Sequence, residues 1–402
     1  MHIKKKCFSL FPLVLFLTLI FSVPFSLAKD TVRLGFSISL TGIYSQAAVS
    51  QMNAYEVWKE KINEEGGIYI RSLGKKLPVE FVYYDDKSDP GTAVRVYEKL
   101  ITQDKVDLVL SPWGTTIHFA VAPLAEKYKI PMVGTTAASV KLRDIKSRYF
   151  WFITSAIPDK QMQALVDLLK SLRIKTAAII YAQDLFPREN LQFLIPELKK
   201  ANIKLLMVKD YPLGARDLTV LLTNVTRKNP QALIALCYPA DSFLLTRQLQ
   251  GVQFNPPFLF ELVGPSIAAF GKVFAKASGG IATMGHWSPK GPWPGAKAFE
   301  NRYMKKWKIR PDYLDSVLAY MGCQILAQAI EKAGTLNREK IRNAIAGGEF
   351  ETIDGAVRFK GTENAVTPSM ILQYQGGNLE IVWPPEAATA SPMFPKPDWP
   401  NK

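Results

Sequence analysis

Cysteine and histidine are scarce in this chain of 402 residues, which contains three of each. Cys7 precedes a long apolar run. Cys237 and Cys323 lie inside apolar stretches, where cysteine commonly packs as a small hydrophobic residue. A disulfide between Cys237 and Cys323 is an alternative if the chain works in an oxidising compartment. The mature chain has only His118 and His286 and no Cys-x-x-Cys pair, so we expect no structural zinc site. We expect no other metal and no cofactor.

The spacings that mark common catalytic sites are also missing. The sequence has no G-x-S-x-G, no G-x-x-x-x-G-K-S/T, no H-E-x-x-H, and no G-x-G-x-x-G after its first predicted strand. Asp85 and Asp86 are adjacent at a strand end, but neighbouring strand residues point in opposite directions, so the pair fits loop polarity better than an acid dyad. A hydrolase built on Ser139 or Thr116 would need a histidine as its base, and no motif in the sequence marks one for either residue. We therefore expect a binding protein and not an enzyme.

The N-terminus has the pattern of an exported protein. A lysine patch at 4–6 precedes an apolar run at 8–27, and small residues end at Ala28. This order is typical of a secretory signal peptide, so we predict that residues 1–28 are removed and that the mature protein is periplasmic. A retained membrane anchor is the alternative, but Pro12 and Pro24 interrupt the run. No later stretch is long and apolar enough to span a bilayer.

The formal net charge is +15, which raises the question of a nucleic-acid partner. Lysine and arginine are spread along the chain without a basic arm or helix, so we expect no such partner and attribute the charge mainly to solubility. It could also modestly favour an anionic ligand. The length that remains after the signal peptide is typical of two domains or lobes.

Predicted strands and helices alternate along most of the chain. The first run has strands at 32–38, 78–84, 107–110, 131–134 and 150–154, with helices at 48–65, 90–103 and 116–128. The second has strands at 176–181, 203–208, 232–236 and 258–261, with helices at 158–172, 188–201 (broken in part by Pro196), 216–227 and 241–250. This alternation predicts an α/β fold of two lobes, each a mainly parallel sheet flanked by helices.

The last part of the chain changes character. Helices are predicted at 312–334 and 337–346, the second with Asn337 as its N-cap. Antiparallel strands are predicted at 351–359, 369–374 and 379–383, before a proline-rich tail that we expect to lie extended along the surface.

Loops rich in small hydroxyl residues follow three predicted strands of the first lobe, at 39–45, 111–116 and 135–139. Ligands of open α/β sheets bind beyond the carboxyl ends of strands. Hydroxyls and free amides at helix N-termini can hold an anion there, although any single threonine fits ordinary helix capping equally well. In the second lobe, the loops at 181–186 and 237–241 bring aromatic residues that could cover a solute or simply pack.

Several segments together resemble a known family. They are GFSISLTGIYS, INEEGGI, YYDDKSDP, VAPLAEKYKIPMVGTTAAS and the terminal VWPPEAATASPMFPKPDW. In this order they are similar to the periplasmic solute-binding proteins of branched-chain amino acid ABC transporters, which have the type I periplasmic binding fold. The resemblance covers nearly the whole mature chain.

The resemblance implies two lobes that are joined by three crossovers and close on a ligand by hinge motion. It assigns 29–153 and 285–360 to the N-terminal lobe, and 154–284 and 361–402 to the C-terminal lobe. The ligand would be a small carboxylate-bearing solute, an apolar or branched-chain amino acid, delivered by a monomer to a membrane permease.

The resemblance also implies a site. It places the carboxylate grip on Thr116, Ala137 (by its amide) and Ser139, the border of the site on Trp113 and Tyr44, and the aromatic contacts of the second lobe on Phe186 and Tyr238.

The acidic partner of the ligand ammonium falls on Glu261 or Leu262, depending on a one-residue shift. If Leu262 faces the ligand, an amino acid would lack its charge partner, at a cost of several kcal/mol. Phe186-Pro187 replaces the tyrosine and glycine usual in the family, which removes a hydroxyl. The alternative ligands are therefore a non-amino organic acid or an amide. A separate alternative for the role is a sensor that presents its ligand to a receptor.

Overall fold

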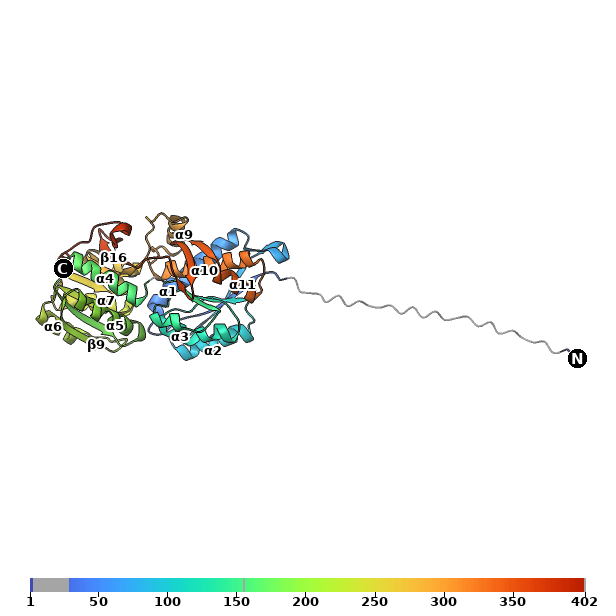
Figure 1. Cartoon of the computed structure of the whole chain (residues 1–402), viewed down its shortest axis with the longest axis horizontal. Helices are drawn as coiled ribbons and strands as arrows, with labels where there is room; N and C mark the ends of the chain where they lie inside the picture. The colour runs from blue at the N-terminus through green and yellow to red at the C-terminus, as the bar shows by residue number, and fades with distance from the viewer. Residues whose placement is uncertain (3–28, 155, 401–402) are drawn as a thin grey trace. The chain divides into compact units, whose positions relative to one another are not determined.

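The computed structural model describes residues 1–2, 29–154 and 156–400 (Figure 1). Most of the predicted signal peptide, including its cleavage site at Ala28, lies outside the described residues. Residues 31–402 belong to one compact unit, which contains both lobes. Within the described ranges, every helix is too short or too polar to cross a membrane.

The first lobe contains two larger sheets and a hairpin. Parallel strands in the order β4-β1-β5 form one sheet, the order of the other is β13-β14-β15-β7-β6, and β2 pairs with β3. The strands are β1 (Val32–Ile38), β2 (Ile68–Ile70), β3 (Lys75–Leu77), β4 (Val79–Asp85), β5 (Leu108–Val109), β6 (Met132–Gly134), β7 (Phe150–Phe152), β13 (Glu349–Thr352), β14 (Gly355–Lys360) and β15 (Glu363–Asn364). The helices are α1 (Ser45–Glu64), α2 (Pro90–Thr102), α3 (Thr115–Lys127), α9 (Ala296–Trp307), α10 (Asp315–Ala333) and α11 (Arg338–Ala346).

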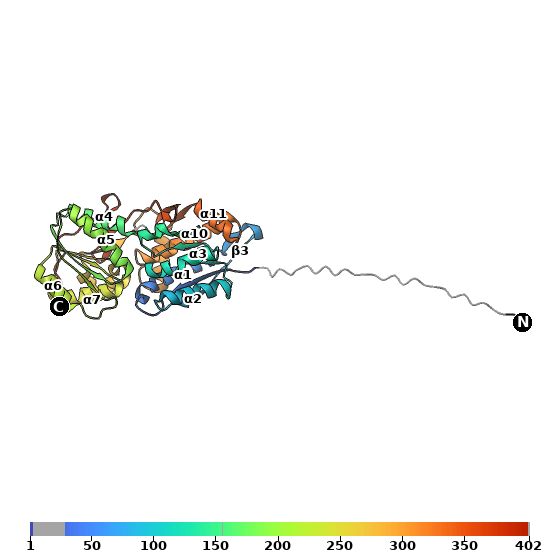
Figure 2. The same cartoon turned by 60° about the horizontal axis from the view of Figure 1, so that its bottom comes forward.

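The second lobe is built on one seven-stranded sheet, in the order β17-β16-β12-β11-β10-β8-β9. The strands are β8 (Thr176–Ala182), β9 (Lys204–Tyr211), β10 (Ala232–Leu236), β11 (Phe258–Glu261), β12 (Ile281–Gly285), β16 (Met370–Gln375) and β17 (Asn378–Trp383). The helices are α4 (Pro158–Ser171), α5 (Leu185–Lys200), α6 (Thr219–Lys228), α7 (Pro239–Gly251) and α8 (Ala268–Phe274). The strands from β9 to β12 are parallel, and α4 and α5 cover one face of the sheet while α6 and α7 cover the other (Figure 2).

The strands that position the site are apolar on both sides, because helices cover both faces of each sheet. All five residues of β10 are buried, as are six of the seven residues of β1. A glycine is required where the chain turns back after α1: Gly67 has φ +97°, and a Cβ there would lie 2.0 Å from the carbonyl oxygen of Leu77.

Three segments connect the lobes, at 153–157, 286–295 and 365–369. The two-lobed α/β fold and its crossovers are thus as predicted. The predicted domain boundaries at 153, 284 and 360 lie close to these segments and stay predictions. The tail after β17 packs on the second lobe, where the backbone N–H of Lys396 donates to Pro257 and the indole N–H of Trp399 donates to Phe254.

Some details differ from the predicted elements. Helix α5 continues through Pro196. The proline has no N–H, so the carbonyl of Gln192 loses its helical partner. Both residues are exposed, so water can take the place of that partner. The strand predicted at 351–359 is a hairpin of β13 and β14 that turns at Ile353-Asp354, directly before Gly355, and the strand prediction passed over the Asp354-Gly355 turn signal. Helices α8 and α9 were not predicted. Cys237 and Cys323 are both free and buried.

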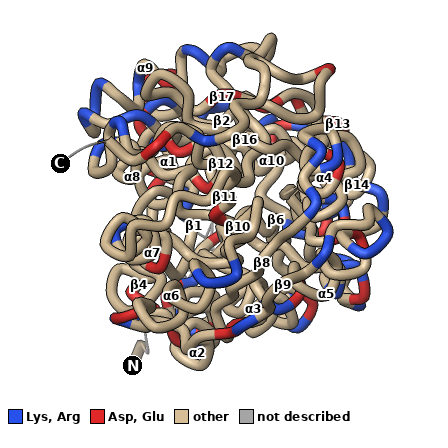
Figure 3. The backbone as a smooth tube through the Cα atoms, turned by 90° about the vertical axis from the view of Figure 1, so that its left-hand side faces the viewer, with Lys and Arg blue, Asp and Glu red and all other residues tan. Residues whose placement is uncertain are grey.

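In Figure 3 the positions of lysine and arginine are interspersed along the backbone with those of aspartate and glutamate. Segments bearing lysine or arginine lie among segments bearing aspartate or glutamate, and many of these charges are paired within one helix. This distribution agrees with charge that serves solubility.

Candidate functional site

A cavity lies between the lobes, at the carboxyl ends of their parallel strands, with about 380 Å³ of space not filled by atoms. The first lobe contributes the loops after β5 and β6 and the start of α10. The second contributes the loops after β8, β10 and β11. The lining residues are Trp113, Gly114, Thr115, Thr136, Ala138, Thr154, Phe186, Tyr238, Val263, Met284, Leu314, Asp315 and Leu318. This lining is mainly apolar and includes no lysine, arginine or histidine from the part of the chain that the structure describes.

A carboxylate of the chain itself, that of Asp184, joins the two lobes beside this cavity. Asp184 is the N-cap of α5, and its Oδ1 accepts a hydrogen bond from the backbone N–H of Leu185 at 2.7 Å. The hydroxyls of Tyr44 and Tyr238 donate to its Oδ2 at 2.8 and 2.9 Å. The hydroxyl of Thr116 donates to its Oδ1 at 3.1 Å. Because Tyr44 and Thr116 belong to the first lobe, two of these bonds cross the cleft.

Two of four clustered aromatic rings, those of Tyr44 and Tyr238, hold this carboxylate, and the other two pack against them. The ring centroid of Tyr44 lies 5.3 Å from that of Trp113 and 5.7 Å from that of Tyr238, and Tyr238 lies 6.5 Å from Phe186. Burial, followed by the negative charge of Asp184, raises the pKa of the Tyr44 and Tyr238 phenols. Both phenols therefore keep their protons at neutral pH and remain hydrogen-bond donors to an anion.

A second acid, Asp315, lies in the first turn of α10 and, unlike the half-buried Asp184, is buried. Its Oδ2 accepts a hydrogen bond at 2.9 Å from the indole N–H of Trp113, which fixes the indole against Tyr44. Burial, and then the nearby charge of Asp312, raises the pKa of Asp315. The cavity thus has one acid, Asp315, in its lining and a second, Asp184, beside it.

The threonines of the hydroxyl loops mostly bond the backbone of neighbouring loops. The hydroxyl of Thr115 accepts from the backbone N–H of Ala138 at 3.0 Å, and that of Thr136 accepts from Gly114 at 3.1 Å. The hydroxyl of Ser139 accepts from the backbone N–H of Lys141 at 3.1 Å. These bonds hold the two loops together at the start of α3, where backbone N–H groups collect.

The structure brings five of the residues proposed for the site into one cluster. Three of them, Tyr44, Thr116 and Tyr238, donate to Asp184, and the rings of the other two, Trp113 and Phe186, pack against the tyrosines. The other two residues of the proposed carboxylate grip, Ala137 and Ser139, are buried on either side of Ala138, which lines the cavity.

Glu261 lies away from this cluster. It is fully buried, and its Oε1 accepts a 2.6 Å bond from the Thr246 hydroxyl of α7, so its side chain faces that helix and not the cavity. Burial raises the pKa of Glu261 to about 8. Neither Glu261 nor Leu262 is among the lining residues. Val263, one residue further along, is one of them.

Sequence reasoning missed Asp184 and Asp315. A signal for Asp184 was available, because it lies directly after a parallel strand and before a helix. It belongs to the same strand-end loop as Phe186, which sequence reasoning did select. Asp315 had none, since its place in the cavity depends on how the helix after the second crossover packs.

Comparison with known proteins places this chain in a family. Residues 31–378 match the family model described as periplasmic binding protein.

The chain is a member of the periplasmic binding protein family.

Among relatives in the family, the leucine-, isoleucine-, valine-, threonine- and alanine-binding protein of Pseudomonas aeruginosa is 25% identical over 342 residues, which are 83% of this chain and 87% of the relative. A Leu/Ile/Val-binding protein homolog of Brucella suis is 19% identical over 387 residues, covering 92% and 95% of the two chains. The branched-chain amino acid type that the sequence resembles is thereby confirmed.

Solved structures of periplasmic binding proteins share the fold. A branched-chain amino acid binding protein from Streptococcus pneumoniae, in complex with isoleucine, superimposes with a TM-score of 0.78 at 20% identity, covering 88% of this chain and 100% of that one. A solute-binding protein of an ABC transporter from R. palustris, in complex with benzoate, has a TM-score of 0.78 at 17% identity, covering 91% and 98%.

Proposed function

We propose that this chain is the periplasmic solute-binding component of an ABC importer, and that it carries a small apolar amino acid from the cleft between its lobes to a membrane permease. Membership of the family and the cavity between the lobes support the general role. The observation that carries the ligand class is the set of charges around the cavity.

Acids and no bases border the cavity within the described residues. Asp184 lies inside a ring of three hydroxyls, and Asp315 lies behind Trp113. An organic acid without an amine would bring a further negative charge close to Asp184, in a partly desolvated place with no cation to offset it. An amino acid brings an ammonium group with its carboxylate. Asp184 therefore takes, in this proposal, the role that the resemblance gave to Glu261 or Leu262.

The remaining groups fit the rest of an apolar amino acid. The loops at 114–116 and 136–139 supply hydroxyls and the N-terminus of α3 for its carboxylate. The side chains of Val263, Met284, Leu314 and Leu318 supply an apolar wall for its side chain.

One observation favours an aromatic carboxylate as the second candidate. The hydroxyls of Tyr44, Thr116 and Tyr238 already hold a carboxylate between aromatic rings. If Asp184 turned away, the carboxylate of a ligand could take its place. A relative of the same fold was solved with benzoate.

A thermal-shift and calorimetric comparison of matched ligands distinguishes the amino acid from the aromatic carboxylate. Leucine is compared with 4-methylpentanoate, which lacks only the amine, with 3-methylbutylamine, which lacks the carboxylate, and with benzoate. We expect leucine, isoleucine or valine to raise the unfolding midpoint and the three partial ligands to leave it unchanged. Stabilisation by 4-methylpentanoate or benzoate, and not by the amino acids, contradicts the amino-acid assignment.

A further inference from the structure

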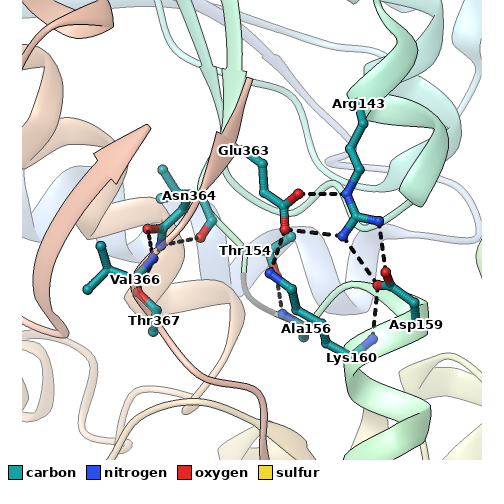
Figure 4. Close-up of polar contacts among 10 residues, drawn as sticks. Arg143, Thr154, Ala156, Asp159, Lys160, Glu363, Asn364, Val366 and Thr367 are labelled. Carbon is teal, nitrogen blue, oxygen red and sulfur yellow. Dashed lines mark hydrogen bonds and ion pairs between the residues drawn. The ribbon is translucent and has the colours of Figure 1, made fainter. Parts of the chain in front are cut away.

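The first and third crossovers run side by side at one edge of the hinge (Figure 4). The side-chain amide of Asn364, at the end of β15, donates to the carbonyl of Ile153 at 3.1 Å and to the hydroxyl of Thr367 at 2.8 Å. Its oxygen accepts from the backbone N–H of Val366 at 3.1 Å. The two connections are thus tied to one another where they leave the first lobe.

Four charged side chains lie beside these crossovers, and we call them the hinge clasp: Arg143, Asp159, Lys160 and Glu363 (Figure 4). The Arg143 guanidinium donates to Glu363 through Nε at 2.6 Å and Nη2 at 3.1 Å. It also donates to Asp159 through Nη1 at 2.8 Å and Nη2 at 3.4 Å. The Lys160 ammonium donates to Glu363 at 2.6 Å.

Two of these ion pairs span the hinge. Arg143 lies on the short 3-10 helix η2 (Val140–Asp144), and Glu363 lies on β15, both in the first lobe. Asp159 and Lys160 lie in the first turn of α4, in the second lobe. The Arg143–Asp159 and Lys160–Glu363 pairs therefore connect the lobes, while the Arg143–Glu363 pair stays within one of them.

The clasp is partly shielded from water. The side chain of Glu363 is 17% exposed, and those of Arg143 and Asp159 are each 32% exposed. Burial alone would raise the pKa of Glu363, but the hydrogen bonds from Arg143 and Lys160 outweigh it and lower that pKa. Forked arginine–carboxylate pairs in a network are stronger and more directional than isolated surface pairs.

The same 3-10 helix joins the clasp to the site. Helix η2 starts directly after Ser139, whose hydroxyl caps it. The backbone N–H of Val140 donates at 3.1 Å to the buried carboxylate of Glu189 on α5, the helix that Asp184 caps. Rotation of one lobe against the other would move α4 and α5 relative to η2, and would so disturb both the clasp and this bond.

We propose that the hinge clasp is a conformational device that stabilises the arrangement of the two lobes described above, in which Tyr44 and Thr116 reach Asp184 across the cleft, and that it makes the balance between this arrangement and more open ones sensitive to ionic strength. The clasp needs no particular solute. By favouring the form that grips a solute, it raises the apparent affinity for any solute that the cleft accepts.

The test is small-angle X-ray scattering of the mature chain with no solute added. The variants are R143Q and D159N, and the control is R302Q, which removes a comparable forked pair within the first lobe, between Arg302 and Glu64 at 2.9 and 2.8 Å. We expect the radius of gyration to rise in R143Q, in D159N and equally in their double variant, but not in R302Q. Unchanged radii in variants with wild-type circular dichroism overturn the proposal, as does an equal rise in R302Q.

Scattering at two salt concentrations tests the proposal even if R143Q fails to fold. The electrostatic screening length falls from about 10 Å at 0.1 M salt to about 3 Å at 1 M. We expect the wild-type radius to rise between these two concentrations and the radius of D159N, which keeps only the Lys160–Glu363 pair across the hinge, to rise less. A parallel response of both chains overturns the proposal. With leucine as the probe, D159N should weaken binding by about threefold to tenfold. If the wild-type chain does not bind leucine, the proposed ligand fails while the scattering result still decides the clasp.

Discussion

At the scale of single residues, the unusual feature is a chain carboxylate held by groups suited to a ligand carboxylate. Asp184 accepts bonds from Tyr44, Thr116 and Tyr238, of which two come from the opposite lobe. All three donors lie in loops that follow predicted strands, and the family resemblance placed each of them in the site. Their common partner was missed, because an aspartate before a helix also fits ordinary capping, a role that Asp184 fulfils as well.

The role of Asp184 is testable with the isosteric variant D184N. If the carboxylate balances the ligand ammonium, its loss should weaken leucine binding by about 2–5 kcal/mol, the cost of removing one partner of a buried charge pair. Titration calorimetry measures the change. The matched ligand 4-methylpentanoate serves as the control: it has no ammonium and is expected not to bind wild type, so loss of the Asp184 charge should not weaken its binding further. Equal leucine affinity in both chains would assign Asp184 to lobe contact alone.

Thr116 gives a second residue-scale prediction. Its hydroxyl is within reach of a carboxylate, so we expect Thr116→Ala to weaken leucine binding by about 1.5–3 kcal/mol, the usual value for hydrogen bonds to charged groups. Ser139→Ala is predicted to have an effect of the same size if its hydroxyl also reaches the ligand. Calorimetry in which neither substitution changes the affinity would remove both from the site.

At the scale of secondary-structure elements, the regular parts were predictable and the irregular ones were not. Buried parallel strands such as β1 and β10 follow from short apolar runs between helices. The continuity of α5 through Pro196 depends on solvent at Gln192, which is a tertiary property. The hairpin of β13 and β14 was signalled by Asp354-Gly355, but the apolar residues on both sides outweighed that signal.

The N-cap of α11, Asn337, was predicted from the sequence and is present in the structure. Asn337 precedes the helix, and its side-chain oxygen accepts from the backbone N–H of Lys340 at 3.1 Å. Asn337→Ala leaves that N–H without its partner and should lower the free energy of unfolding by about 1 kcal/mol. Asn337→Ser keeps a capping oxygen and should cost less. Urea denaturation monitored by circular dichroism compares the two, and an equal loss in both variants would argue against the capping role.

At the scale of the whole molecule, the second lobe encloses a buried acid and a buried base. Glu261 lies within the lobe, and the tail brings the side chain of Lys396 into the protein interior. Burial raises the pKa of Glu261 to about 8 and lowers that of Lys396 to about 8. Sequence reasoning assigned Glu261 to the ligand because it could not see that the end of β11 turns this side chain toward α7.

The pH dependence of stability distinguishes a buried acid from one that faces a solute. The pKa of Glu261 is raised in the folded chain, from 4.5 to about 8, so the folded state holds its proton more firmly than the unfolded state. The stability that this group contributes is therefore complete below pH 4.5 and is lost as the pH rises through 8. Glutamine cannot titrate, so E261Q does not share the loss of stability of the wild type as the pH rises. The free energy of unfolding of E261Q minus that of wild type should therefore increase between pH 5 and pH 8. Urea denaturation at both pH values measures this difference. A constant difference would mean that Glu261 is ionised in the folded chain throughout this range, with a positive charge or solvent beside it.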